Sequence, residues 1–340
     1  MRPLLAPLAA LYGAVVNARN SRLDRAGERQ QAALPVISVG NLSTGGTGKT
    51  PVVRWLAETL SRRGERVAIV TRGYGGDVGK GPFLASNGEG ALAAPARIGD
   101  EPWMLAATLP GTLVVVGSKR VEGAALAAAR GASLILLDDG FQHRQLERDV
   151  DIVLLDQTRP FWKDRLLPQG RLREPLAALK RASAFIVTRS DREADRDEHE
   201  QHLRAIGATA PVYAADHQPA GFFDSQAVEQ AAPRRAIAFC GIGNPDRFKA
   251  DLEALGVDVC RFHPLRDHQT ITLQRLQALA SEAASQEATL VTTEKDLARI
   301  GSHDDGIPLL TLRISLRLPQ REALLQQIDS AIQQHRERSR

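Results

Sequence analysis

The stretch GNLSTGGTGKTP occupies Gly40–Pro51 and directly follows the apolar run Pro35–Val39. This order predicts a strand that enters a glycine-rich turn and then a helix. Glycines let backbone N–H groups surround phosphate oxygens, Lys49 can reach the β- and γ-phosphates, and the Thr50 hydroxyl can ligate Mg²⁺. The segment therefore predicts a P-loop that binds a nucleoside triphosphate. The residues expected around the phosphates are Ser43, Thr44, Gly45, Gly46, Thr47, Gly48, Lys49 and Thr50.

The spacing departs from the pattern G-x-x-x-x-G-K-[ST], because Ser43 stands where that pattern has its first glycine. The pair Gly45-Gly46 can supply the flexibility instead. A plain glycine-rich turn between a strand and a helix is the alternative. The sequence Gly48-Lys49-Thr50, placed between a strand and an amphipathic helix, favours phosphate binding.

Composition narrows the classes of partner. A length of 340 residues predicts two domains, and the cysteines Cys240 and Cys260 are too few and too far apart for a CxxC metal site or a disulfide framework. A net charge of +4 favours anionic partners. No basic run with interleaved aromatic residues is present, which argues against nucleic acid, and nothing indicates an obligate protein partner.

Apolar runs alternate with helical patterns and predict a doubly wound parallel α/β sheet of the P-loop NTPase type, with its ligand loops at the carboxyl ends of the strands. The expected strands are Val36–Val39, Val67–Thr71, Leu113–Val116, Leu134–Leu137, Ile152–Leu155 and Phe185–Thr188, with helices at Val52–Arg62 and Val121–Arg130. A second, smaller α/β domain is expected to begin at Ala236. The expected ranges are 1–34 for an N-terminal helix, 35–215 for the P-loop domain, 216–235 for a linker and 236–340 for the smaller domain.

The N-terminal segment carries apolar residues at helical spacing. They are Leu4, Leu8, Leu11, Tyr12, Val15 and Val16, and they precede Arg19, Arg22, Arg25 and Arg29. The stretch is shorter than the ~20 residues that span a bilayer. It predicts either an amphipathic helix that lies on an anionic membrane or a helix that packs on the core.

Acidic residues follow the predicted strands. Asp138-Asp139 end an apolar strand and fit a Walker-B site that holds Mg²⁺ opposite the loop threonine. Asp100, in Gly99-Asp100-Glu101-Pro102, can be a helix N-cap or a base that deprotonates a hydroxyl. His268 follows Asp267 and can join a proton-handling pair or serve as a structural histidine.

Basic residues stand in loops on the same predicted edge. Arg72 and Tyr74 lie in RGYGG, Arg120 begins a helix, and Arg173 precedes Glu174 in LREP. Each arginine can bind a phosphate group of a substrate, and each can equally be a surface charge.

Taken together, the motifs resemble the tetraacyldisaccharide 4′-kinase family of lipid A biosynthesis. The matching blocks are GNLSTGGTGKTP, TRGYGG, GDEP, DDGFQH, LLPQGRLREP, FCGIGNPDRF, DH at 267–268 and TTEKD at 292–296. The resemblance implies two α/β domains joined by a short β linker and transfer of the ATP γ-phosphate to the 4′-hydroxyl of tetraacyldisaccharide 1-phosphate, which yields lipid IVA. It also implies a peripheral or monotopic location on the cytoplasmic face of the bacterial inner membrane.

The resemblance further assigns roles to individual residues. It implies that Asp100 activates the hydroxyl with help from His268, and that Lys49 and Thr50 are the phosphate-loop residues. The remaining implied metal-region and catalytic acids are Asp138, Asp139 and Glu174. Gln269 stands where many relatives have a second histidine, so no role is assigned to it.

Other P-loop proteins fit less well. A deviant switch ATPase has a lysine where this chain has Thr44, and a GTPase needs N/T-K-x-D, of which Thr188-Arg189-Ser190-Asp191 is a poor match. A binding module without chemistry does not account for the acids at the strand ends.

Overall fold

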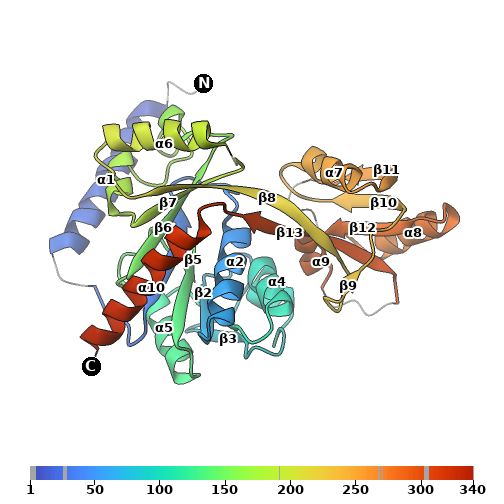
Figure 1. The fold of residues 1–340 in the computed structure, drawn as a ribbon, viewed down its shortest axis with the longest axis horizontal. Coiled ribbons are helices and arrows are strands. Elements are labelled where there is room, and N and C mark those ends of the chain that lie inside the picture. The colour runs from blue at the N-terminus through green and yellow to red at the C-terminus, as the bar shows by residue number, and fades with distance from the viewer. Residues whose placement is uncertain are drawn as a thin grey trace.

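The computed structural model describes residues 5–25, 29–190, 192–266, 269, 271–301 and 306–339. Figure 1 shows a larger and a smaller part, joined by the long strands β8 (Val212–Phe223) and β13 (Leu309–Arg317). All strands on the main path belong to one continuous sheet in the order β11-β10-β12-β13-β8-β7-β6-β1-β5-β2-β4-β3.

The larger part is a parallel sheet with one antiparallel edge strand, β3. Its strands are β1 (Val36–Asn41), β2 (Val67–Thr71), β3 (Phe83–Ser86), β4 (Leu113–Val116), β5 (Leu134–Asp138), β6 (Val150–Asp156) and β7 (Ala184–Thr188). Its helices are α1 (Ala6–Arg25), α2 (Lys49–Arg62), α3 (Pro95–Ile98), α4 (Asp100–Thr108), α5 (Arg120–Ala129), α6 (Glu193–Ala205) and α10 (Arg321–Arg338), with short 3₁₀ turns η2 (Phe161–Lys163) and η3 (Leu176–Arg181). The predicted fold class is confirmed, because continuous β-branched and leucine runs are buried on both faces of the sheet.

The smaller part is a second α/β unit. It consists of β10 (Arg235–Cys240), α7 (Pro245–Ala254), β11 (Asp258–Pro264), α8 (Leu273–Ser285), β12 (Thr289–Thr293) and α9 (Glu294–Ile300). Its strands pair in parallel, and β13 closes the sheet by pairing with β12.

The strand β8 belongs to both parts. Its first residues pair in parallel with β7, from Val212 to Ala215, and its later residues pair antiparallel with β13, from Asp216 to Phe223. The expected linker 216–235 therefore includes strand structure, the second half of β8 and the short β9 (Glu229–Gln230).

The final helix α10 packs on the larger part. Leu324, Ile328 and Ile332 are buried in the same apolar cluster as Ile37 of β1. Gln327 donates a hydrogen bond to the Ser183 carbonyl at 2.7 Å. This helix, which the expected range 236–340 assigned to the smaller domain, thus buries its apolar face on the first sheet.

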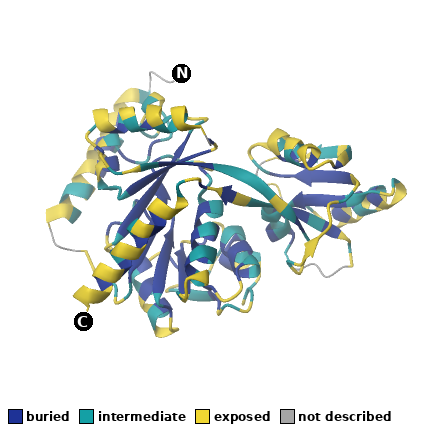
Figure 2. Cartoon of the chain, in the orientation of Figure 1, coloured by how far each residue is buried: buried dark blue, intermediate teal, exposed yellow. Residues whose placement is uncertain are grey.

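The helix α1 has two different apolar sides. Ala9, Gly13 and Val16 are buried against the larger part, whereas Leu8 and Leu11 are 54% and 63% exposed. Figure 2 shows this outward face of α1 as exposed, in contrast to the buried strands of the sheet. None of the described helices is long and apolar enough to cross a membrane.

Candidate active site

The predicted phosphate loop connects β1 to α2. Gly48, the residue before α2, has φ 81°, and a Cβ atom there would lie 2.5 Å from Cε1 of His217. Glycine is required at this position because a side chain is excluded both by the left-handed backbone and by the imidazole of β8.

The loop backbone is held from several sides. Thr188 donates to the Thr47 carbonyl at 2.9 Å, and Arg189 donates to the Gly46 carbonyl at 2.6 Å. The Thr44 amide donates to the Arg171 carbonyl at 2.8 Å. The ends of β7 and the LPQGR turn therefore fix the shape of the loop, and Ser43 takes part through a bridge to Leu172.

Lys49 lies among acceptors at the carboxyl ends of the strands. Its ammonium group is 3.4 Å from Asp139 Oδ1 and donates to Asn41 Oδ1 at 3.2 Å. Arg173 donates to the other oxygen of Asp139, Oδ2, at 2.8 Å. The structure thus brings together three predicted site residues, and it adds Asn41, which sequence reasoning missed although it stands within the GNLSTGGTGKTP motif.

The two strand-end acids differ electrostatically. Asp138 accepts a hydrogen bond from Thr71 at 3.0 Å. Burial, together with the negative charges of Glu101 and Asp139, raises the pKa of Asp138 to about 6. Burial also acts to raise the pKa of Asp139, but the charges of Lys49 and Arg173 outweigh it and keep that pKa below its ordinary value.

The acids of GDEP begin α4, next to the phosphate loop. Gly99 has φ 92°, and a Cβ there would lie 2.7 Å from the Tyr74 carbonyl, so this glycine lets the RGYGG loop approach the helix. Thr50 Oγ1 donates to Glu101 Oε1 at 3.4 Å. The N-cap of α4 is Gly99, and Asp100 is the first residue of the helix. The Asp100 carboxylate accepts a hydrogen bond from Arg299 at 3.3 Å. Asp100 is therefore not the N-cap of α4.

His268 lies outside the described residues, so the structure does not place it relative to Asp100. Glu101, by contrast, is a site residue that the sequence reasoning passed over, although it stands beside Asp100 in the same motif. Burial acts to raise the pKa of Glu101, but Lys295 and Lys49 outweigh it and hold that pKa below its ordinary value.

The described side-chain contacts of Glu174 are not with Lys49. Its Oε2 atom accepts hydrogen bonds from Asn20 of α1 at 2.8 Å and from Arg181 at 3.0 Å, and the side chain is 1% exposed. The described contacts of Glu174 are therefore those of a residue that fixes α1 to the larger part.

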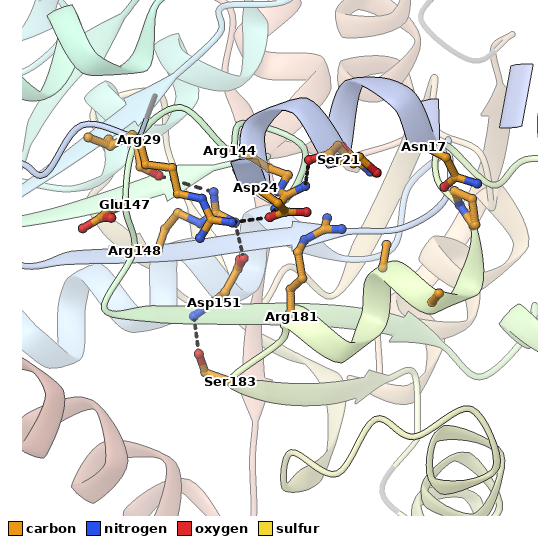
Figure 3. A pocket seen from close by; sticks show the side chains of 15 residues that line it. Asn17, Ser21, Asp24, Arg29, Arg144, Glu147, Arg148, Asp151, Arg181 and Ser183 are labelled. Atoms are coloured by element: carbon orange, nitrogen blue, oxygen red, sulfur yellow. Dashed lines mark hydrogen bonds and ion pairs between the residues drawn. The ribbon is translucent and has the colours of Figure 1, made fainter. Parts of the chain in front are cut away.

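A cavity of about 660 Å³ lies under α1 (Figure 3). Four arginines line it, and each already has a carboxylate partner. The pairs are Arg29–Asp24, Arg144–Asp24, Arg148–Asp151 and Arg181–Glu174. None of the predicted site residues that the structure describes lines this cavity, and Asp24 of α1 takes part in its charged network.

The predicted substrate-binding residues fall into two groups. Arg72 and Tyr74 are exposed, Tyr74 by 87%, on the RGYGG loop. Arg120 is 2% exposed and donates to the Gly117 carbonyl at 2.5 Å, and burial lowers its pKa to about 10. Arg173 is engaged with Asp139 and with Gln142. Arg72 is therefore accessible to a ligand, whereas Arg120 donates hydrogen bonds to the backbone carbonyls of Gly117 and Asp138.

The whole chain matches known proteins closely. A sequence model of the family described as tetraacyldisaccharide-1-P 4′-kinase matches residues 1–333. A tetraacyldisaccharide 4′-kinase of Chlorobaculum parvum is 41% identical over 308 residues, 88% of this chain and 84% of its own length. The enzyme of the same name from Bradyrhizobium diazoefficiens is 38% identical, over 98% of this chain and 94% of its own length.

A solved structure agrees. The crystal structure of LpxK from Aquifex aeolicus, described as a complex with ATP, has a TM-score of 0.79 and 31% identity, and the match covers 97% of this chain and 99% of that one. By its sequence over nearly its full length and by its fold, this chain belongs to the tetraacyldisaccharide-1-P 4′-kinase family.

Proposed function

We propose that the chain transfers the γ-phosphoryl group of ATP to the 4′-hydroxyl of tetraacyldisaccharide 1-phosphate, giving lipid IVA in lipid A biosynthesis. The observation that carries the proposal is the meeting of Lys49, Asp139 and Glu101 of α4 beside one P-loop. Family membership supports both substrates, because the relatives carry this activity in their names.

The proposed chemistry assigns a task to each group. Asp100 takes the proton of the 4′-hydroxyl group while the 4′-oxygen forms a bond to the γ-phosphorus of ATP. The bond between the γ-phosphorus and the leaving oxygen of ADP breaks in the same transfer. Lys49 places positive charge where the transferring group gathers negative charge. His268 assists Asp100, and Arg72, Tyr74 and Arg173 are proposed to contact the sugar phosphate.

The donor set suits Mg²⁺. Asp139 Oδ1 is buried, pairs with the Lys49 ammonium at 3.4 Å but accepts no hydrogen bond from the described residues, and lies with Asp138 at the end of β5. Carboxylate and hydroxyl oxygens are the ligands that Mg²⁺ prefers, so Asp138, Asp139 and Thr50 would hold it. When bound, Mg²⁺ neutralises phosphate charge during transfer.

We further propose that α1 lies on the anionic cytoplasmic face of the inner membrane. Leu8, Leu11 and Val15 are exposed on one side of the helix, and Arg19 continues that side one turn later. The acyl chains of the substrate would then enter from the bilayer next to the RGYGG loop.

The decisive experiment is a transfer assay with Mg-ATP, purified protein and the disaccharide 1-phosphate, with the product position assigned by NMR. Phosphate on the 4′-oxygen supports the proposal. Phosphate on another hydroxyl, or ATP hydrolysis without transfer, contradicts it. A matched pair tests the membrane step: Leu8→Ser with Leu11→Ser is expected to weaken vesicle binding, whereas Gln333→Ser with Glu337→Ser on α10 is not.

A further inference from the structure

The motif TTEKD is not explained by nucleotide or sugar chemistry, although it stands out in the sequence. It forms the end of β12 and the start of α9, and Figure 1 shows α9 beside α4, where the smaller part meets the larger. Thr293 begins α9 as its N-cap and accepts a hydrogen bond from the Asp296 amide at 3.2 Å. This cap fixes the residue at which α9 begins.

Two basic residues of α9 lie one turn apart and face two adjacent acids of α4. Lys295 donates to Glu101 Oε1 at 3.0 Å, and Arg299 donates to Asp100 Oδ2 at 3.3 Å. Residues four apart share one side of a helix, so a single face of α9 serves both carboxylates.

Arg299 is itself rigidly placed. It is 6% exposed, and its Nη1 atom donates to the Gly241 carbonyl at 2.7 Å and to Asp296 Oδ1 at 3.0 Å. The other Asp296 oxygen accepts the Gly241 amide at 3.0 Å. The GIGNP turn and the aspartate of TTEKD therefore hold the guanidinium in the direction of Asp100.

Glu294 attaches the same helix to α2, the helix that follows the phosphate loop. It pairs with Arg54 at 2.6 Å, and the two side chains are 10% and 7% exposed. Arg313 donates to the other Glu294 oxygen at 3.0 Å. Both Glu294 oxygens are paired, each with a different arginine, and breaking a charged pair this well buried costs much, so α9 is not free to shift along α4.

Glu101 links this arrangement to the phosphate loop. The Thr50 hydroxyl has one proton, which it donates to Glu101, so its lone pairs are left for the phosphate side. We propose that Arg299 and Lys295 are positioning residues of the kinase: α9 of the smaller part orients Asp100 for proton removal and, through Glu101, orients the Thr50 hydroxyl. This inference rests on the proposed function, in which Asp100 is the base.

The test is a double-mutant cycle on transfer to the lipid disaccharide 1-phosphate at saturating Mg-ATP. Arg299→Ala is expected to lower kcat about 10²-fold, the typical effect of misplacing a reacting group, with little change in the Kd for Mg-ATP. In the Asp100→Asn background the same substitution is expected to cause no further loss. Arg299→Lys, which keeps the charge, is expected to recover part of kcat.

The outcomes separate this inference from the proposed function. If Asp100→Asn leaves kcat unchanged, the role of Asp100 in the proposed function fails. If Asp100→Asn is damaging but the Arg299 and Asp100 losses multiply, the positioning role fails alone. Lys249→Ala, which removes a charge paired with Glu253 on α7, is the control and is expected to leave kcat unchanged.

A second set of variants replaces Lys295 and leaves Arg299 intact, because Arg299 has many contacts whose loss could affect the result. Lys295→Ala is expected to raise the KM for Mg-ATP several-fold, ~3- to 10-fold as for loss of one modest charge contact, while thermal stability stays constant. In the Glu101→Gln background, Lys295→Ala is expected to cause no further rise in the KM for Mg-ATP. An unchanged KM, or losses that multiply with those of Glu101→Gln, overturns the proposed link to Thr50.

Discussion

The phosphate loop after β1 and the GIGNP turn after β10 are both glycine-containing turns between a parallel strand and a helix. They differ in whether other protein groups form hydrogen bonds with the backbone of the turn. In the second turn, the Asp296 carboxylate accepts a hydrogen bond from the Gly241 amide, and Arg299 donates a hydrogen bond to the Gly241 carbonyl. In the first turn, no carboxylate of the described residues accepts a backbone hydrogen bond from residues 45–48. A glycine-rich turn therefore becomes a candidate anion site only where its amides are not already used by the protein.

The difference between the two turns is tested most directly by replacing Lys49, because the second turn has no residue that corresponds to it. Lys49→Ala is expected to lower kcat roughly 10²–10³-fold, because positive charge is lost at the transferring phosphate. Steady-state kinetics at saturating ATP measure the loss. Arg247→Ala, at the start of the helix after the second turn, is the matched control and is expected to keep wild-type kcat. Near-normal turnover of Lys49→Ala would contradict the assignment of the first turn.

The left-handed glycine of the first turn is the next point to test. Gly48→Ala is expected to destabilise the fold by about 1–3 kcal/mol, because φ is +81° and the new Cβ meets His217 at 2.5 Å. Denaturant unfolding without nucleotide measures the difference in free energy. Gly46→Ala is the control, since a Cβ there has no described atom within 4 Å. Equal stability of the two variants would show that the loop is not confined by β8.

The histidine behind the first turn predicts a pH dependence of stability. Burial, with the charges of Arg189 and Arg247, lowers the pKa of His217 from 6.5 to about 4, so the folded protein holds this imidazole neutral. The unfolded chain binds its proton below pH 6.5, and folded-state stability is therefore present above that pH and is lost as pH falls towards 4. The contribution is at most about 1.4 kcal/mol per pH unit.

The measurement is a series of unfolding curves between pH 7 and pH 4 for the wild type and His217→Gln. The substitution is expected to reduce the loss of stability over this range. His202→Gln on α6, a half-buried histidine that stacks on Trp162, is the control. Parallel curves for wild type and His217→Gln would mean that the imidazole is not held neutral against the loop.

The second turn is expected to show a purely structural effect. Asn244 accepts a hydrogen bond from the Arg247 amide at 3.3 Å and begins α7. Asn244→Ala is expected to lower the free energy of unfolding by about 1 kcal/mol with kcat unchanged. Thermal melting and the transfer assay decide this together. A large loss of kcat at normal stability would indicate that the second turn also has a catalytic function.

Much of the first unit could be predicted from the chain order. Buried parallel strands are continuous apolar runs, so β2 and β4 have the predicted limits, and a strand followed by GKT predicts the loop that Lys49 occupies. Asp138 and Asp139 were predicted beside it because parallel strands end at the same edge of a sheet.

The helix α10 and the residue Glu174 show where such reasoning ends. The apolar face of α10 predicts that the helix is buried but not against which unit, and its partners on β1 are almost 300 residues earlier in the chain. The LREP motif predicts an acid near the site, whereas the contacts with Asn20 and Arg181 direct Glu174 towards α1.

The sequence by itself determined the α/β fold, the phosphate loop and the pair of strand-end acids, because periodicity and local backbone chemistry act over a few residues. The tertiary structure alone decided that His217 of β8 confines Gly48 and that α9 presents Lys295 and Arg299 to α4. Ion pairs between residues about 200 positions apart depend on how the two units are placed. That placement follows from the two strands that join them, and no local pattern of residues encodes it.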